Sequence, residues 1–274
     1  MHSRISLHQV CLPGSDAAGF IAAAGAMGAA NVVLGSPSLG DPAAVAAARA
    51  AMQAGGPRVA ALCHPFAIHP NLADDAGGAA AALDRVADAA VAVGARAIYL
   101  LTGGRGWMSW EQAAARFAVL IGPVAERAQA RGVSLMIENA SPLYVDIHIA
   151  HGLADTIALA EQADIGVCAD LFFCWAEAGL SPLFRRAMPR CGLVQVSDHV
   201  PGDRALPARA VPGDGAVPLE ALLHDVLDAG YQGVFDIELI GPRIDAEGHA
   251  AATLRAGERV SEILVRLGVR DGAG

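Results

Sequence analysis

Short apolar segments alternate with alanine-rich segments along the whole sequence, and this alternation limits the possible folds more than any other feature. The apolar segments have the length and residue types of buried strands. Eight of them occur, near residues 4–10, 31–35, 58–64, 96–102, 133–139, 165–170, 192–198 and 233–239. The segments between them predict helices, several opened by Asp, Ser or Pro, near residues 42–54, 76–93, 109–130, 150–162, 218–229 and 247–267.

Eight strand–helix units in a chain of 274 residues predict a closed α/β barrel. A (β/α)8 TIM barrel of about 250 residues folds as one unit. No linker divides the sequence, so we predict a single domain over residues 1–274. A doubly wound open sheet is the alternative fold. The barrel places its active site at the C-terminal ends of the strands.

The charge of the chain bears on its partners. A net charge of −9 disfavours nucleic acid or an anionic membrane, because either attracts a basic surface. We therefore expect a small-molecule substrate. The uncharged stretch 17–40 is too rich in Gly and too poor in large apolar residues to predict a membrane span. His8, Gln9 and Pro13 interrupt the apolar region that a signal peptide needs, so we expect a cytoplasmic protein.

Four predicted strands in the second half each run into a polar residue that can bind a metal ion. These residues are Glu138, Asp170, Gln195 and Glu238. An unpaired buried carboxylate is costly, whereas three carboxylates and an amide oxygen around one cation satisfy each other. Such a set of hard oxygen ligands favours Mn²⁺ or Mg²⁺ over Zn²⁺. The alternative is that each is an isolated polar residue at the solvated end of its strand.

These same segments resemble the xylose-isomerase-like TIM-barrel superfamily. The resemblance covers nearly the whole chain, and its most specific parts are IEN at 137–139, Asp170, VQVSD at 194–198, PGDG at 212–215 and GYQGVFDIEL at 230–239. The superfamily includes sugar epimerases, hydroxypyruvate isomerases, inosose-processing enzymes and 3-dehydroshikimate dehydratases. The resemblance implies one divalent metal ion at the four polar residues, with Glu138 and Glu238 exchanging protons with substrate carbons. It also implies a homodimer or homotetramer.

The sequence departs from the superfamily pattern at two positions. Many members have His at the third metal position, where this chain has Gln195. Hydroxypyruvate isomerases and dehydroshikimate dehydratases are similar to this chain in using Gln there. Many members also have a substrate-contacting His three residues after the sixth-strand Asp, where this chain has Phe173. Phe173 cannot transfer a proton or bind a hydroxyl group, so it predicts a more apolar pocket and a less hydroxylated or ring-shaped substrate.

Four further polar residues are candidates for substrate contacts. His64 ends the third predicted strand, and His199 follows the seventh. Arg204 and Arg209 lie in the loop 202–215, and such loops hold substrate anions in barrel enzymes. We expect one of the two arginines to bind a substrate carboxylate or oxyanion. The alternative for each histidine is a hydrogen-bonded residue of the core or of a loop. The alternative for each arginine is a solvated surface residue.

Together these residues predict a divalent-metal-dependent isomerase or epimerase. Its substrate would be a small keto-sugar or hydroxy-keto acid, and its reaction would be proton abstraction through an enediolate. One alternative is a lyase of the 3-dehydroshikimate dehydratase kind, in which the same proton abstraction expels a β-hydroxyl group. The other alternative is a non-catalytic barrel that binds a sugar.

Overall fold

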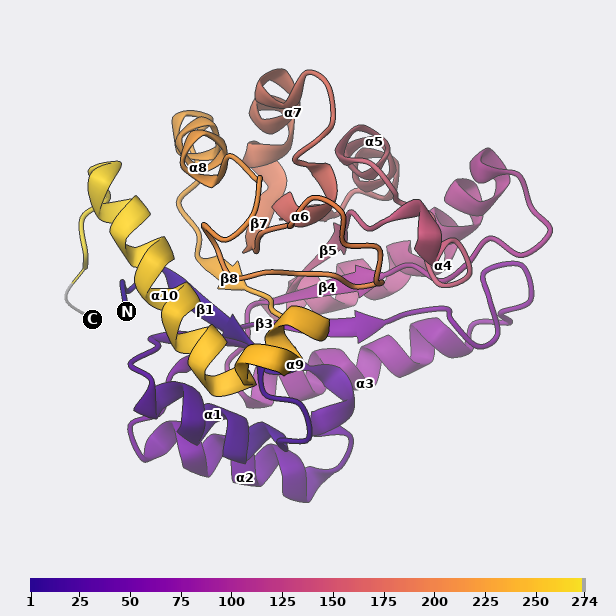
Figure 1. Cartoon of the computed structure of the whole chain (residues 1–274). Coiled ribbons are helices and arrows are strands. Elements are labelled where there is room, and N and C mark those ends of the chain that lie inside the picture. The colour runs from indigo at the N-terminus through magenta and orange to yellow at the C-terminus, as the bar shows by residue number, and fades with distance from the viewer. Residues whose placement is uncertain (273–274) are drawn as a thin grey trace.

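Eight parallel strands join in sequence order, and the last pairs with the first to close a barrel (Figure 1). The computed structural model describes residues 1–272. The strands are β1 (Ile5–His8), β2 (Asn31–Gly35), β3 (Arg58–Pro65), β4 (Ala97–Leu101), β5 (Ser134–Glu138), β6 (Gly166–Asp170), β7 (Cys191–Val196) and β8 (Phe235–Ile237). The predicted TIM barrel is therefore confirmed, and all eight predicted strands are present.

The helices surround the strands on the outside of the barrel (Figure 1). They are α1 (Ala17–Ala26), α2 (Pro42–Gln53), α3 (Gly78–Ala92), α4 (Trp110–Ala130), α5 (Leu153–Ala163), α6 (Leu171–Cys174), α7 (Leu180–Ala187), α8 (Leu219–Asp228), α9 (Pro242–Glu247) and α10 (His249–Arg266). The sequence did not predict α7, which is only eight residues long and lies between Gly179 and Pro189.

Local signals explain where several helices begin. The Asp41 carboxylate accepts hydrogen bonds from two backbone N–H groups at the start of α2, and Pro42 occupies the first helical position. Ser109 and Gln112 form a reciprocal capping box at the start of α4. The uncharged stretch 17–40 contains α1 and β2. Within residues 1–272 no helix has both the length and the apolar composition that crossing a membrane requires.

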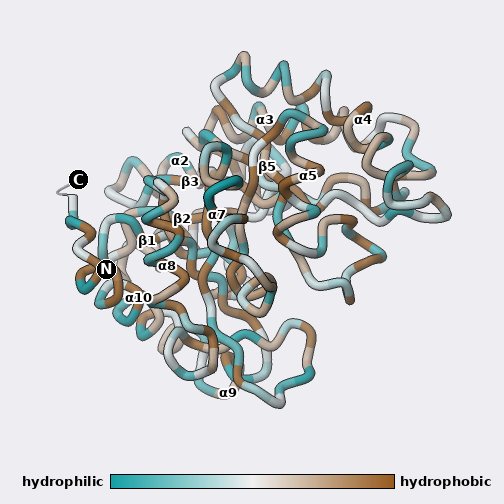
Figure 2. Tube along the Cα trace, turned by 90° about the horizontal axis from the view of Figure 1, so that it is seen from above, coloured by the Kyte–Doolittle hydropathy of each residue, from teal (hydrophilic) through white to brown (hydrophobic). Residues whose placement is uncertain are grey.

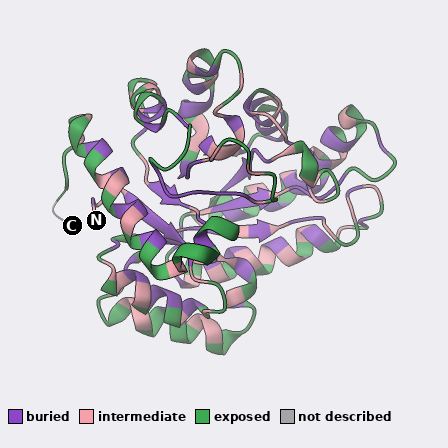
Figure 3. Ribbon diagram, in the orientation of Figure 1, coloured by how far each residue is buried: buried purple, intermediate pink, exposed green. Residues whose placement is uncertain are grey.

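The barrel interior contains an apolar cluster. It is formed by Val33, Ala61, Tyr99, Met136, Cys168 and Leu193. A second, larger core lies between the outer faces of the strands and the helices. The strands are consequently buried on both faces, whereas most helices expose one side (Figure 3). Hydrophobic residues are frequent along the strands, and hydrophilic residues are frequent on the surrounding helices and loops (Figure 2).

Candidate active site

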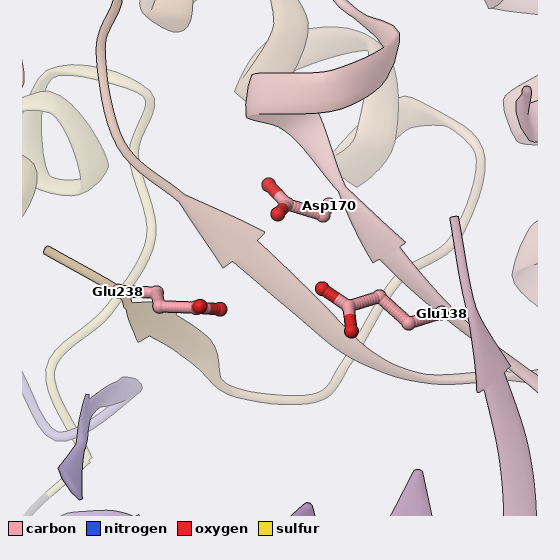
Figure 4. A group of neighbouring side chains, drawn as sticks. All are labelled: Glu138, Asp170 and Glu238. Atoms are coloured by element: carbon pink, nitrogen blue, oxygen red, sulfur yellow. The ribbon is translucent and has the colours of Figure 1, made fainter. Parts of the chain in front are cut away.

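Three carboxylates converge at the C-terminal end of the barrel (Figure 4). Glu138 ends β5, Asp170 ends β6, and Glu238 directly follows β8. One oxygen from each carboxylate lies within 4.8 Å of the other two. Glu138 and Asp170 are buried, and the Glu238 side chain is 14% exposed. The structure therefore brings the three acidic residues of the predicted metal site to one place.

Gln195, the fourth predicted ligand, lies beside these carboxylates in β7. It pairs in register with Asp170 of β6. Its amide nitrogen donates hydrogen bonds to Glu238 Oε2 and to the Tyr99 hydroxyl, the latter at 3.2 Å. Its amide oxygen accepts a hydrogen bond from Cys168 Sγ at 3.3 Å. Gln195 thus contacts the cluster through its nitrogen rather than its oxygen.

Arg209 inserts a buried guanidinium group into the carboxylate cluster. Its Nη2 lies 2.6 Å from Asp170 Oδ2 and 3.4 Å from Glu238 Oε1. Burial alone lowers the pKa of Arg209, but Asp170 and Glu238 outweigh burial and raise it, so the guanidinium stays charged. Of the two candidate loop arginines, Arg209 is the one that reaches the site.

Asp236 is a further buried carboxyl group, two residues before Glu238 and on the same face of β8. Neither of its oxygens has a hydrogen bond of good geometry among the described residues. The Ser6 hydroxyl is its polar neighbour across the β1–β8 pairing. Burial, and then the charge of Glu238, raise the pKa of Asp236 well above its ordinary value. Burial therefore favours the protonated, neutral form of Asp236, a residue for which the sequence predicted no role.

The charges of the cluster fit a divalent cation. Glu138, Asp170 and Glu238 carry three negative charges when ionised, and Arg209 compensates one. Burial, followed by the charges of Glu238 and Asp170, raises the pKa of Glu138 well above its ordinary range. A divalent cation would neutralise the two remaining charges and favour the ionised form of Glu138. The three carboxylates would hold such an ion, and an all-oxygen set suits a hard cation.

The metal-free protein is expected to lose stability as the pH rises above the ordinary pKa range of carboxyl groups. Asp236 and Glu138 have pKa values raised by folding, each mainly through burial. Their protonated forms contribute stability that is fully present below the unfolded pKa and is lost as the pH rises through the folded pKa. Each group contributes a slope of up to about 1.4 kcal/mol per pH unit in that window. Urea denaturation in EDTA at several pH values measures the slope.

Asp236→Asn is the informative variant for this pH dependence, because asparagine keeps the shape of the side chain but does not ionise. Its stability should depend less on pH than that of the wild type. Equal slopes for the two proteins would mean that Asp236 has the same protonation state in the folded and the unfolded protein over this range.

A buried carboxylate organises the loop that carries Arg209. Asp198 pairs with Ala210 through two backbone hydrogen bonds, which bring the loop back against the end of β7. The Asp198 side chain accepts hydrogen bonds of 2.8–3.0 Å from the backbone N–H groups of His199, Gly213, Gly215 and Val217. Asp198 thereby connects VQVSD to PGDG and positions Arg209.

A cavity of about 270 Å³ opens above the carboxylates at the C-terminal ends of the strands. Its polar lining comprises His8, Tyr99, Glu138, Tyr144, Arg209 and Glu238. Its remaining walls are mainly apolar and include Val10, Leu101, Ile147, Phe173, Pro207 and Ile240. Phe173 therefore contributes an apolar wall, as the sequence predicted. A larger hollow of about 670 Å³ lies at the opposite end of β4–β7 and contains none of the clustered carboxylates.

Three predicted substrate contacts do not reach this cavity. His64 hydrogen-bonds the Ser36 hydroxyl at 2.8 Å, on the outward side of β3. His199 is half-buried, with its ring packed near Phe172. Arg204 is exposed, and its guanidinium donates to the backbone oxygen of the preceding residue. The structure therefore does not support direct contacts of these residues with a substrate at the carboxylates.

Comparisons with known proteins agree with this fold. The sequence matches the family described as "Xylose isomerase-like TIM barrel" over residues 20–259, so the chain belongs to that family. A comparison with curated protein sequences finds no match. Among solved structures, protein SMc04130 from Sinorhizobium meliloti 1021 is 21% identical, with a TM-score of 0.82 over 96% of this chain and 98% of that one.

Two further solved structures share the barrel. D-psicose 3-epimerase from Clostridium cellulolyticum H10, solved with D-tagatose, is 15% identical and has a TM-score of 0.79 over 95% of this chain and 99% of that one. The IolI protein, solved with a zinc atom, is 14% identical and has a TM-score of 0.80 over 96% of this chain and 99% of that one. At these identities the likeness establishes the fold.

Proposed function

We propose that this protein is a divalent-metal-dependent isomerase or epimerase of a small keto-sugar or hydroxy-keto acid. The observation that carries the proposal is the convergence of Glu138, Asp170 and Glu238 beside the buried Arg209 at the catalytic end of a barrel. A divalent cation at these carboxylates would make a C–H bond next to a substrate carbonyl more acidic. The epimerases among the structural neighbours support this class of reaction.

The residues around the cavity have complementary roles in this proposal. Glu138 and Glu238 approach the site from opposite sides, so one can remove a proton from a substrate carbon and the other can return one (Figure 4). Arg209 can hold a substrate carboxylate or oxyanion. The apolar walls restrict water, which strengthens these electrostatic contacts. We propose Mn²⁺ or Mg²⁺ as the metal, a cytoplasmic location, and a homodimer or homotetramer.

Deuterium exchange tests the proposed reaction. The purified protein would be freed of metal and incubated in D₂O with a panel of keto-sugars and hydroxy-keto acids, followed by NMR. We expect deuterium incorporation and an isomeric product with Mn²⁺ or Mg²⁺, and neither in EDTA. Exchange that continues undiminished in EDTA would contradict a metal-dependent reaction. A zinc-loaded sample belongs in the panel because the IolI structure contains zinc.

The apolar walls also favour a second candidate, a dehydratase that acts on a ring-shaped keto acid. Phe173 and its apolar neighbours leave few partners for the hydroxyl groups of a sugar. Arg209 could bind the carboxylate of such an acid. Loss of water creates a conjugated product, so rising ultraviolet absorbance with 3-dehydroshikimate would favour the dehydratase. Exchange without loss of water would favour the isomerase.

A further inference from the structure

A chain of hydrogen bonds inside the barrel connects β1, β4 and β7. His8 Nε2 lies 2.8 Å from the Tyr99 oxygen, and Gln195 Nε2 lies 3.2 Å from the same oxygen. All three side chains are buried. Because buried polar groups need protein partners, the positions of the protons along this chain follow from counting donors and acceptors.

His8 determines which groups donate and which accept along this series of hydrogen bonds. The backbone N–H of Val10 donates to His8 Nδ1 at 3.1 Å, so Nδ1 carries no proton. Burial, and then the charge of Arg209, lower the pKa of His8 to about 3, in keeping with a neutral ring. The single ring proton is therefore on Nε2, which donates to the Tyr99 oxygen.

This orientation of the Gln195 amide leaves the Tyr99 proton with a poor acceptor. The phenol oxygen already accepts from His8 and from the Gln195 amide nitrogen. The Tyr99 hydroxyl donates its own proton to the thiol of Cys63, which is a weak acceptor. Turning the amide by half a turn exchanges its oxygen and nitrogen. Tyr99 then donates to the Gln195 oxygen, and that oxygen faces Glu238.

We propose that Tyr99, held by His8, is a positioning residue that turns the amide oxygen of Gln195 toward the three carboxylates when a divalent cation binds. This inference rests on the proposed function, because it requires the cation. In this orientation the amide nitrogen donates to Glu238, and an oxygen in its place would face another oxygen. A divalent cation held by the carboxylates would remove that conflict, and Tyr99 would supply the proton that the turned amide oxygen accepts. Gln195 would then be a fourth oxygen ligand.

The Mn²⁺ affinity of Tyr99→Phe tests the proposal. Titration calorimetry, with electron paramagnetic resonance of free Mn²⁺ as a second readout, should show affinity about 10- to 100-fold weaker than in the wild type. Tyr231→Phe is the matched control, because Tyr231 is also buried and donates to the Val234 backbone oxygen at 2.6 Å. It should bind Mn²⁺ like the wild type even if both variants lose stability.

Gln195→Glu separates orientation from a general effect on the shape of the site. A carboxylate presents an oxygen whichever way it is turned, so adding Tyr99→Phe to Gln195→Glu should weaken Mn²⁺ binding by less than about threefold. An equal loss in both backgrounds would overturn the proposal. If Gln195→Glu does not fold, the comparison of the two tyrosine variants decides alone.

The remaining outcomes distinguish this proposal from the function on which it rests. Unchanged Mn²⁺ affinity in Tyr99→Phe would overturn the role of Tyr99 and leave the metal-dependent function in place. Failure of the wild type to bind Mn²⁺ would remove the proposed function and this inference together.

Discussion

Glu138→Gln and Glu238→Gln are each expected to weaken Mn²⁺ binding by at least about 100-fold. Each substitution removes one negative charge from a buried set in which, among residues 1–272, only Arg209 forms ion pairs with the carboxylates. An amide is a weaker ligand than a carboxylate for a hard cation, and loss of a direct ligand should cost at least as much as loss of its hydrogen-bonding partner. Metal content by mass spectrometry and affinity by calorimetry measure the effect.

The metal-free stability of Glu138→Gln should change in the opposite direction. Burial and the neighbouring carboxylates raise the pKa of Glu138, so its ionised form destabilises the folded protein at about pH 8. Replacing it with a neutral amide relieves the repulsion. A variant that merely disrupts the fold would lose both metal affinity and stability, so the opposite signs identify a ligand.

Glu262→Gln supplies the control for both variants. Glu262 is exposed on α10, so the same chemical change there should leave the metal content unchanged. It should alter the free energy of unfolding by no more than about 0.5 kcal/mol. Equal metal content in the wild type, Glu138→Gln and Glu238→Gln would contradict a shared metal site at these residues.

The fold and the meeting of the carboxylates could be predicted because they depend on local patterns and on barrel geometry. Apolar strands alternating with helices specify parallel pairing, and a closed barrel brings its strand ends together. Glu238 shows that the exact strand boundary is not critical. It directly follows β8 rather than ending it, but its carboxylate still reaches Glu138 and Asp170. An error of one or two residues in a strand boundary does not disturb this convergence.

The direction of individual side chains could not be predicted in the same way. His64 lies near the end of an apolar strand that is buried on both faces. The sequence therefore shows no inward–outward alternation to reveal that His64 faces Ser36 and the helices. Arg204 and Arg209 are five residues apart in one loop. Which of them is buried depends on the long-range hydrogen bonds of Asp198.

The hydrogen bonds between polar residues inside the barrel could not be predicted from the sequence, for a related reason. Tyr99 lies in the apolar segment AIYLL, where an aromatic residue is ordinary strand composition. Its contacts with His8 and Gln195 join residues 91 and 96 positions apart. Such a network becomes visible only when the strands are placed around one axis.

Arg209→Met is expected to destabilise the metal-free protein by about 3–5 kcal/mol near pH 8. The substitution removes the buried cation that pairs with Asp170 and Glu238 and leaves their charges uncompensated. The loss should be smaller near pH 5, because carboxyl groups with raised pKa values then become protonated. Urea denaturation in EDTA at the two pH values measures both quantities.

Matched variants show whether this loss arises from the buried cluster. Arg243→Met breaks an exposed ion pair with Asp203 and should cost less than about 1 kcal/mol. Arg209→Lys should be intermediate, because lysine keeps the charge but lacks the planar, forked set of donors. A loss in Arg209→Met no larger than in Arg243→Met would mean that the clustered carboxyl groups are already neutral without metal.

Metal addition should stabilise Arg209→Met, because a divalent cation compensates the charges that Arg209 had compensated. Mn²⁺ at about 100 times its dissociation constant should stabilise the variant by about 2.7 kcal/mol relative to the metal-free variant. Arg209→Met should also bind Mn²⁺ at least as tightly as the wild type, since Asp170 no longer pairs with a competing cation. Weaker Mn²⁺ binding in this variant would instead show that Arg209 holds the carboxylates in their binding geometry. Tight metal binding combined with lost deuterium exchange would place Arg209 at the substrate rather than at the metal.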